Sequence, residues 1–111
     1  MKTFIAKKLI IIFGIILLLT KPVFGQILFG ARDCGQWVAR TEVAKVTREA
    51  WFVGYMSGLN VMGVAGGKID VLEKVNSVEQ LYLWMDNYCN KNPLNLVSTG
   101  ANVLFFELAR K

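Results

Sequence analysis

Two cysteines, Cys34 and Cys89, follow an N-terminal segment that has the layout of a secretory signal peptide. Export would bring the rest of the chain into an oxidising compartment, where a disulfide between these cysteines forms and persists. After the first 25 residues, 86 of the 111 residues remain, which is enough for one domain. A domain of this size often needs a cross-link to be stable. We therefore expect a single domain at residues 26–111 that is held together by one disulfide.

The signal peptide is predicted from three parts of residues 1–25. Lysines near the start precede an unbroken apolar run at residues 9–19, and Val23 and Gly25 stand in the cleavage positions before residue 26. An uncleaved transmembrane anchor is the alternative. The run of eleven apolar residues is short for a membrane helix, which needs about 20, and Lys21 and a proline follow it. We expect cleavage, a periplasmic location and no stable membrane insertion of the mature chain.

The cysteine pair allows one intramolecular bridge, and an intermolecular bridge is the alternative. Closing the long loop between Cys34 and Cys89 would stabilise the fold by roughly 4 kcal/mol in the loop-entropy description. That amount is comparable to the whole net stability of a small domain. The intramolecular disulfide is therefore the pairing we expect.

The net charge argues against a nucleic-acid partner. The full chain carries +5, but four of its thirteen basic residues lie in the first 25 residues. Residues 26–111 contain nine basic and eight acidic residues, which gives them a formal net charge of +1. A nucleic-acid-binding domain needs a concentrated basic stripe, so we expect neither a nucleic acid nor an anionic membrane surface as a partner.

The pattern of apolar residues predicts helices and no strands. A short first helix is expected from Cys34 to Lys45, after an irregular lead-in, and a longer one from Val46 to Met62. The glycines within 63–67 are expected to break the long helix, and residues 69–75 to form a short helical turn.

The long helix is apolar nearly all round, which is typical of a buried helix. Ala50, Gly54 and Gly58 form a strip of small residues along it, which would let another helix cross closely. In a membrane such a strip suggests helix dimerisation. The charged ends and the short span favour a soluble core helix instead.

Two further helices are predicted towards the C-terminus. Ser77 with Gln80 has the spacing of a capping box, and the helix that follows should end at Asn92 before Pro93. Asn92 and Pro93 are then expected to begin a last helix, as N-cap and first residue, with Gly100 weakening its middle. The predicted fold class is all-α: a small single-domain helical bundle with three main helices and a short one.

The sequence offers little for catalysis. It contains no histidine, which removes the most common catalytic base and metal ligand. The carboxylates that could do acid–base work lie on predicted polar faces: Asp70, Glu73, Glu79 and Asp86. No zinc spacing, phosphate loop or calcium loop is present. We expect a protein that is not an enzyme and that needs no cofactor and no metal.

Apolar side chains on the outer sides of the last two helices are the candidate protein-binding residues. They are Leu83, Trp84, Leu96, Val103 and Phe106. Several of them on neighbouring helices would form a patch of the kind that marks a protein contact. The alternative is routine burial under the N-terminal segment or the glycine-rich loop. Lys68, in that loop, is a further candidate.

Three stretches resemble a known family of secreted bacterial proteins. They are Cys34-Gly35-Gln36-Trp37, the segment WFVGYMSGLN at 51–60, and SVEQLYLWMDNYCNKNPL at 77–94. In this respect the chain resembles the Tai-type immunity proteins of type VI secretion. The resemblance implies a periplasmic helical protein, often a homodimer, that occludes the active site of a peptidoglycan amidase toxin. A protruding element would do this, and the loop at 63–69 with Lys68 is the expected one.

A looser similarity links the same landmarks to HdeA-type acid-stress chaperones of the periplasm. That similarity implies a dimer that comes apart in acid and exposes apolar surface to unfolding proteins. Carboxylates that are paired at neutral pH and protonated near pH 4 would supply the trigger. The chain carries eight carboxylate side chains, so this chaperone function stands as the alternative.

Overall fold

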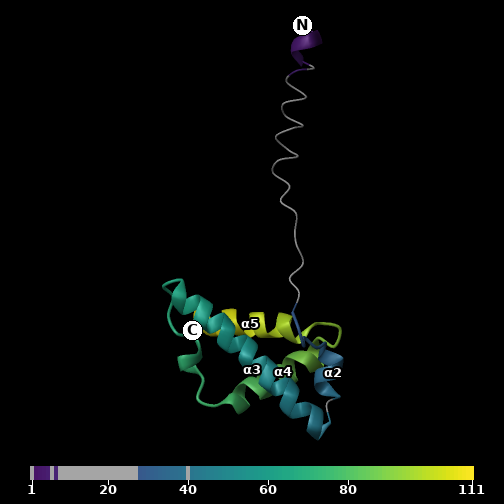
Figure 1. Ribbon diagram of the computed structural model, residues 1–111, viewed down its shortest axis with the longest axis vertical. Coiled ribbons are helices and arrows are strands. Elements are labelled where there is room, and N and C mark those ends of the chain that lie inside the picture. Colours follow the sequence, from purple (N-terminus) through teal and green to yellow (C-terminus); the bar gives the residue numbers. More distant parts are fainter. Residues whose placement is uncertain (1, 6, 8–27, 40) are drawn as a thin grey trace.

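The computed structural model describes residues 2–5, 7, 28–39 and 41–111 (Figure 1). The cleavage site and most of the expected signal peptide lie outside these residues. None of the described helices is both long and apolar enough to cross a membrane.

The domain is all-α, as predicted, with three main helices and one disulfide between Cys34 and Cys89. Its elements in chain order are α2 (Cys34–Val38), α3 (Glu42–Ala65), the 3-10 helix η1 (Leu72–Lys74), α4 (Val78–Lys91) and α5 (Val97–Arg110). The long helix α3 lies across α4 and α5, and the short α2 lies beside α4 (Figure 1).

The hydrophobic core lies where α3 crosses the other helices. Trp37 of α2 is completely buried and meets the Phe52 ring of α3 edge-on, with ring centroids 5.5 Å apart. The other fully or almost fully buried side chains include Met56, Met85, Val97 and Ala101. Each main helix therefore contributes one apolar stripe, as amphipathic helices of a globular domain do.

The first predicted helix, from Cys34 to Lys45, was too long. Helix α2 ends at Val38, and α3 begins at Glu42. Thr41 separates them, because its side-chain oxygen accepts a hydrogen bond from the backbone N–H of Ala44 and caps α3. The second helix, predicted from Val46, therefore starts four residues earlier, at Glu42.

The capping box is formed by a different pair of residues from the one predicted. Ser77 precedes α4, but its side chain makes no capping bond, and Gln80 accepts instead from the N–H of Asn76 at 3.0 Å. The box is at α2, where the Asp33 carboxylate accepts from the N–H of Gln36 at 2.7 Å and the Gln36 side chain bonds back. It fixes the first turn, from which Cys34 and Trp37 point into the core.

The last helix begins later than predicted. The N–H of residue 95 bonds to the Asn92 carbonyl at 3.0 Å, so Asn92 and Pro93 form a turn. Asn92 also donates its side-chain amide to the Tyr88 carbonyl at 2.9 Å, and therefore ends α4 rather than starting α5. Leu96 is the N-cap of α5, and Leu94, which falls inside the predicted helix, lies before it and is 96% exposed.

The lead-in to α2 is tied to this turn. Residue 33 forms an isolated antiparallel bridge with Leu96, and the N–H of Val97 donates to the Arg32 carbonyl at 2.9 Å. The N–H of Cys34 donates to the carbonyl of residue 95 at 2.8 Å. These bonds hold the start of the domain against the start of α5.

Gly100 has a packing role that the sequence did not reveal. It is buried in α5, and a Cβ atom at this position would lie 2.7 Å from Cδ1 of Tyr88 and 2.9 Å from the Met85 sulfur. Real Cβ atoms essentially never show such distances, so a side chain at this position would force Tyr88 and Met85 to shift. Gly100 therefore lets α4 and α5 approach closely, and this outweighs its poor helix propensity.

Replacing Gly100 with alanine should lower the free energy of unfolding by about 1–2 kcal/mol, because overpacking outweighs the gain in helix propensity. Denaturant unfolding followed by circular dichroism measures this. Gly58→Ala is the matched control, because its Cβ would meet nothing within 4 Å, and it should stabilise the fold by about 0.5–1 kcal/mol. A Gly100→Ala variant that is as stable as the unsubstituted protein would contradict the close approach of α4 and α5 at this residue.

Candidate functional site

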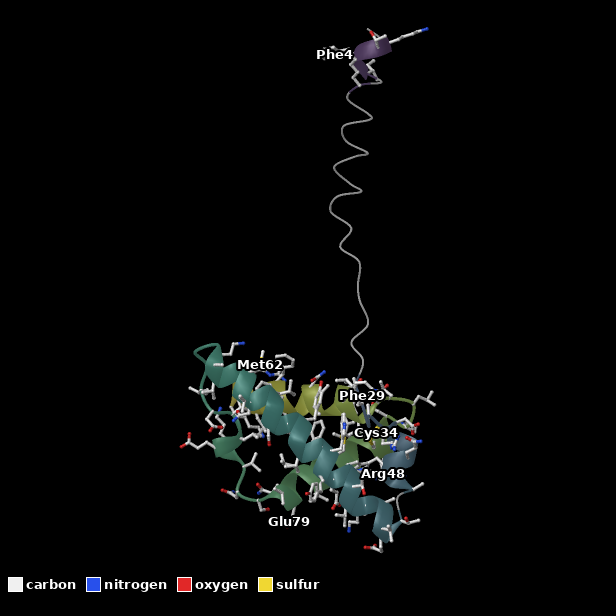
Figure 2. All side chains as sticks on the ribbon, viewed as in Figure 1. Phe4, Phe29, Cys34, Arg48, Met62 and Glu79 are labelled. Carbon is white, nitrogen blue, oxygen red and sulfur yellow. A yellow bond between two sulfur atoms is a disulfide. The ribbon has the colours of Figure 1, made fainter. Side chains whose placement is uncertain are left out.

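Exposed apolar side chains gather at the C-terminal end of α3. Met62 is 74% exposed, Val61 is 66% exposed, and Ile69, just beyond the helix, is 62% exposed. Figure 2 labels Met62 at the end of the domain away from Cys34. We call residues 61–69 the α3 tip. Single exposed apolar residues are ordinary, but a cluster of them is typical of a contact surface.

A groove of about 450 Å³ lies between the α3 tip and α5. Its lining residues are Leu59, Met62, Gly63, Gly66, Lys68, Asn102, Phe105 and Phe106. The aliphatic and aromatic side chains form most of its wall, and Lys68 and Asn102 are the polar groups in it. We call this hollow the Met62 groove. Its composition suits an apolar side chain of a partner with a polar group beside it.

The glycine-rich segment is a helix end and a tight turn rather than the break predicted for 63–67. Helix α3 runs through Gly63 and ends at Ala65, with Gly66 as its C-cap. Gly67 has a φ of 80°, in the left-handed region that glycine favours. The N–H of Lys68 then bonds to the Gly63 carbonyl at 3.0 Å, which closes the turn.

Asn60 holds the segment after this turn against α3. Its side-chain oxygen accepts from the N–H of Val71 at 2.8 Å, and its side-chain amide donates to Asp70 at 2.7 Å. Val71 is buried in the core. The α3 tip is thus anchored at both ends, and its exposed side chains are presented by a fixed backbone.

The candidate residues from the sequence do not form one surface. Lys68 and Phe106 both line the Met62 groove. Trp84 of α4 does not line this groove and is stacked on Tyr88, with ring centroids 5.3 Å apart. It lines a separate hollow of about 270 Å³ that Lys74 and Leu108 also line.

The three remaining candidates lie apart from the groove lining. Leu83 is exposed on α4, Val103 is exposed on α5, and Leu96 lies at the bridge to Asp33. Met62 was not among the candidates from the sequence. Its exposure depends on which side of α3 the other helices cover, and tertiary packing decides this.

Two of the four carboxylates considered for catalysis, Asp70 and Asp86, accept structural hydrogen bonds. Asp70 accepts from Asn60 and from the N–H of Glu73, and Asp86 accepts from the indole N–H of Trp37 at 2.7 Å. Among the described residues, no group of three or more His, Cys, Asp or Glu side chains could hold a metal ion. The geometry of these carboxylates is that of caps and hydrogen-bond acceptors.

One titratable group is shifted by its surroundings. Burial raises the pKa of the Tyr82 hydroxyl above its ordinary 10.0, and the carboxylates of Glu49 and Glu79 raise it further. The folded state therefore holds this proton more tightly than the unfolded chain. Stability from this group is complete below pH 10 and falls only in the alkaline range. At neutral pH the side chain is an uncharged part of the interface between α3 and α4.

The comparisons with known proteins give no relative. No protein-family model, no curated protein and no solved structure matches this chain.

Replacing Asn60 with alanine should release the segment after the α3 tip, because the N–H of Val71 and the Asp70 carboxylate lose their partner. We expect faster hydrogen exchange at residues 66–72 and a loss of about 1–2 kcal/mol in the free energy of unfolding. Asn90→Ala, on the exposed side of α4, is the control and should change neither. Unchanged exchange in the Asn60 variant would show that the segment is held by other contacts.

Proposed function

We propose that this protein is a periplasmic, non-catalytic binding protein of the immunity type, which inhibits a peptidoglycan amidase by placing the α3 tip in its active-site cleft. The observation that carries the proposal is the exposed Met62 beside an apolar groove, on a tip whose backbone is fixed. The resemblance of residues 34–108 to Tai-type immunity proteins supplies the class of partner. The disulfide agrees with an oxidising compartment.

The α3 tip has the properties of an interface anchor. A few large apolar side chains at the centre of an interface provide most of the binding energy. Methionine adapts its shape to a partner pocket, and Met62 stands clear of the fold. Because Asn60 and the turn at Gly67 fix the tip beforehand, little conformational entropy would be lost on binding. Lys68 adds a positive charge at the edge of the groove.

The chaperone alternative needs carboxylates that acid would uncouple. The ion pair of Glu107 with Lys111, at 3.7 Å, lies on exposed side chains at the end of α5. The Asp33 and Asp70 carboxylates accept hydrogen bonds at the surface. Such solvent-exposed interactions contribute little to stability, and Asp86, the acceptor of the Trp37 indole N–H, is a single partly buried carboxylate rather than a coupled group of them. The apolar α3 tip, by contrast, is exposed without any acid trigger, and this favours the immunity-type function.

The proposed function requires a peptidoglycan amidase gene beside the gene of this protein, and its test is titration of the protein, purified from the periplasm, into that amidase. Mass spectrometry of the intact purified protein comes first. A mass that corresponds to residues 26–111, less two hydrogens for the disulfide, would establish export and oxidation. We expect stoichiometric inhibition of the amidase. Met62→Glu and Phe106→Glu should each weaken binding at least about 30-fold, as the loss of an interface anchor does.

Thr99→Glu, exposed on α5 outside the groove lining, is the matched control and should inhibit like the unsubstituted protein. Circular dichroism of each variant separates loss of binding from loss of fold. An amidase that stays fully active at saturating concentrations would contradict the proposed function. Full inhibition by the Met62 and Phe106 variants would contradict the assigned site.

A further inference from the structure

The segment that leads into α2 lies against the first half of α3. The indole N–H of Trp51 donates a hydrogen bond to the Phe29 carbonyl at 2.7 Å. Gly30 follows with a φ of 77°, and a Cβ atom there would lie 2.9 Å from Cδ1 of Trp51. The left-handed backbone and the close approach both favour glycine at this position. We call residues 28–32 the strap, and these contacts fix it on α3.

A hollow of about 270 Å³ lies between the strap and α3. Its lining residues are Gly30, Arg32, Ala44, Thr47, Arg48 and Trp51. The four that come from α3 recur at spacings of three and four, which places them on one side of the helix. We call this hollow the arginine hollow. Figure 2 labels Arg48 and Met62 towards opposite ends of α3, so the arginine hollow is separate from the Met62 groove.

Two guanidinium groups line the arginine hollow, and none of its described lining residues is acidic. The neighbouring carboxylates along the chain are engaged elsewhere. Asp33 accepts from the N–H of Gln36, and Glu49 lies near Tyr82 of α4. Two like charges at one hollow repel each other, and an anion placed between them removes this repulsion. The charge of the hollow therefore favours an anionic ligand.

The two arginines are presented from fixed positions. The Arg48 guanidinium is half-buried and donates to the Gln36 carbonyl in α2. A guanidinium has five N–H donors, so this bond leaves donors for a ligand. Arg32 ends the strap, and its own carbonyl accepts from the N–H of Val97 at 2.9 Å. Little conformational entropy of the backbone would therefore be lost on binding.

We propose that the arginine hollow binds the carboxylate at the C-terminal end of a peptide. Guanidinium groups bind oxyanions through paired N–H donors, and the Thr47 hydroxyl is a further donor in the lining. The rest of the lining decides between the oxyanions. Gly30, Ala44 and Trp51 form an apolar wall beside the arginines. The last side chain of a peptide can cover this wall, whereas a phosphate ion would leave it bare.

The volume and exposure of the hollow limit the ligand and its affinity. Pockets for drug-sized molecules have about 300–1,000 Å³, so a hollow of about 270 Å³ takes one or two residues of a peptide. The Arg32 side chain is exposed, and exposed charge pairs bind weakly. We therefore expect a dissociation constant of about 1 mM, which should rise with salt because the charges are screened.

The indole N–H of Trp51 is a built-in probe for this site. The chain has three tryptophans, Trp37, Trp51 and Trp84, and Trp51 is the one that lines the arginine hollow. Isotope-labelled, oxidised protein purified from the periplasm is titrated with N-acetyl-alanyl-alanine and followed by nuclear magnetic resonance. The Trp51 indole resonance should shift and saturate, with the other two unmoved. The C-terminal amide of the same dipeptide should give no saturable shift, because it carries no charge.

Replacing Arg32 with glutamine should weaken binding of the dipeptide at least about 10-fold, as the loss of a charged hydrogen-bond donor does. The Arg32 side chain makes no bond to another described residue, so circular dichroism should show an unchanged fold. Arg32→Lys keeps the charge without the paired donors and should give an intermediate affinity. Arg110→Gln, exposed at the end of α5, is the matched control and should bind like the unsubstituted protein.

Several results would overturn the proposal. They are a Trp51 resonance that does not move, equal binding of the acid and the amide, and an Arg32→Gln variant that binds like Arg110→Gln. Inorganic phosphate at the same ionic strength should bind more weakly than the dipeptide, and tighter binding of phosphate would overturn the choice of a carboxylate. Met62→Glu should bind the dipeptide unchanged, so this site and the proposed function can fail independently.

Discussion

The disulfide between Cys34 and Cys89 is the constraint on which the rest of this fold depends. It joins α2 to the last turn of α4, with Cα atoms 4.8 Å apart and a sequence separation of 55. A helix of five residues has no stability of its own in water. The covalent bond keeps α2 in place, and α2 in turn delivers Trp37, which is fully buried against Phe52 and hydrogen-bonded to Asp86. Three helices thus meet at one side chain close to the disulfide.

This core leaves much of α3 uncovered. Only Phe52 and Met56 of its 24 residues are fully buried. The side of α3 turned away from the core, at Val46, Ala50 and Gly54, and the α3 tip consequently stay exposed, whereas the sequence predicted a helix that is buried nearly all round.

The sequence predicted the elements whose signals are local and strong. The all-α class, the cysteine pairing and the end of α4 before Pro93 are confirmed, because apolar periodicity, a single cysteine pair and a proline leave few alternatives. The predicted capping box of α4 and the predicted start of α5 were wrong. Several polar residues could cap each helix, and contacts with Tyr88 and with the lead-in to α2 decided between them.

The surfaces were harder to predict than the fold. Gly100 and Gly54 both lie inside a predicted helix, but Gly100 is buried against Tyr88 and Gly54 is exposed. Helical spacing places a residue on a side of its own helix, and tertiary packing decides which side is covered. Lys68 and Phe106, both candidate contacts from the sequence, line one groove, whereas the position of Met62 beside them depends on the path of α3 beyond Gly63.

The most direct test of this account compares the free energy of unfolding of the oxidised protein with that of a Cys34→Ala/Cys89→Ala variant. Near-ultraviolet circular dichroism reports the environment of Trp37 in each. We expect the variant to lose about 4 kcal/mol, together with the signal of a fixed Trp37, because α2 is no longer held against α4. A variant that keeps its stability and its near-ultraviolet spectrum would contradict the central role of the disulfide.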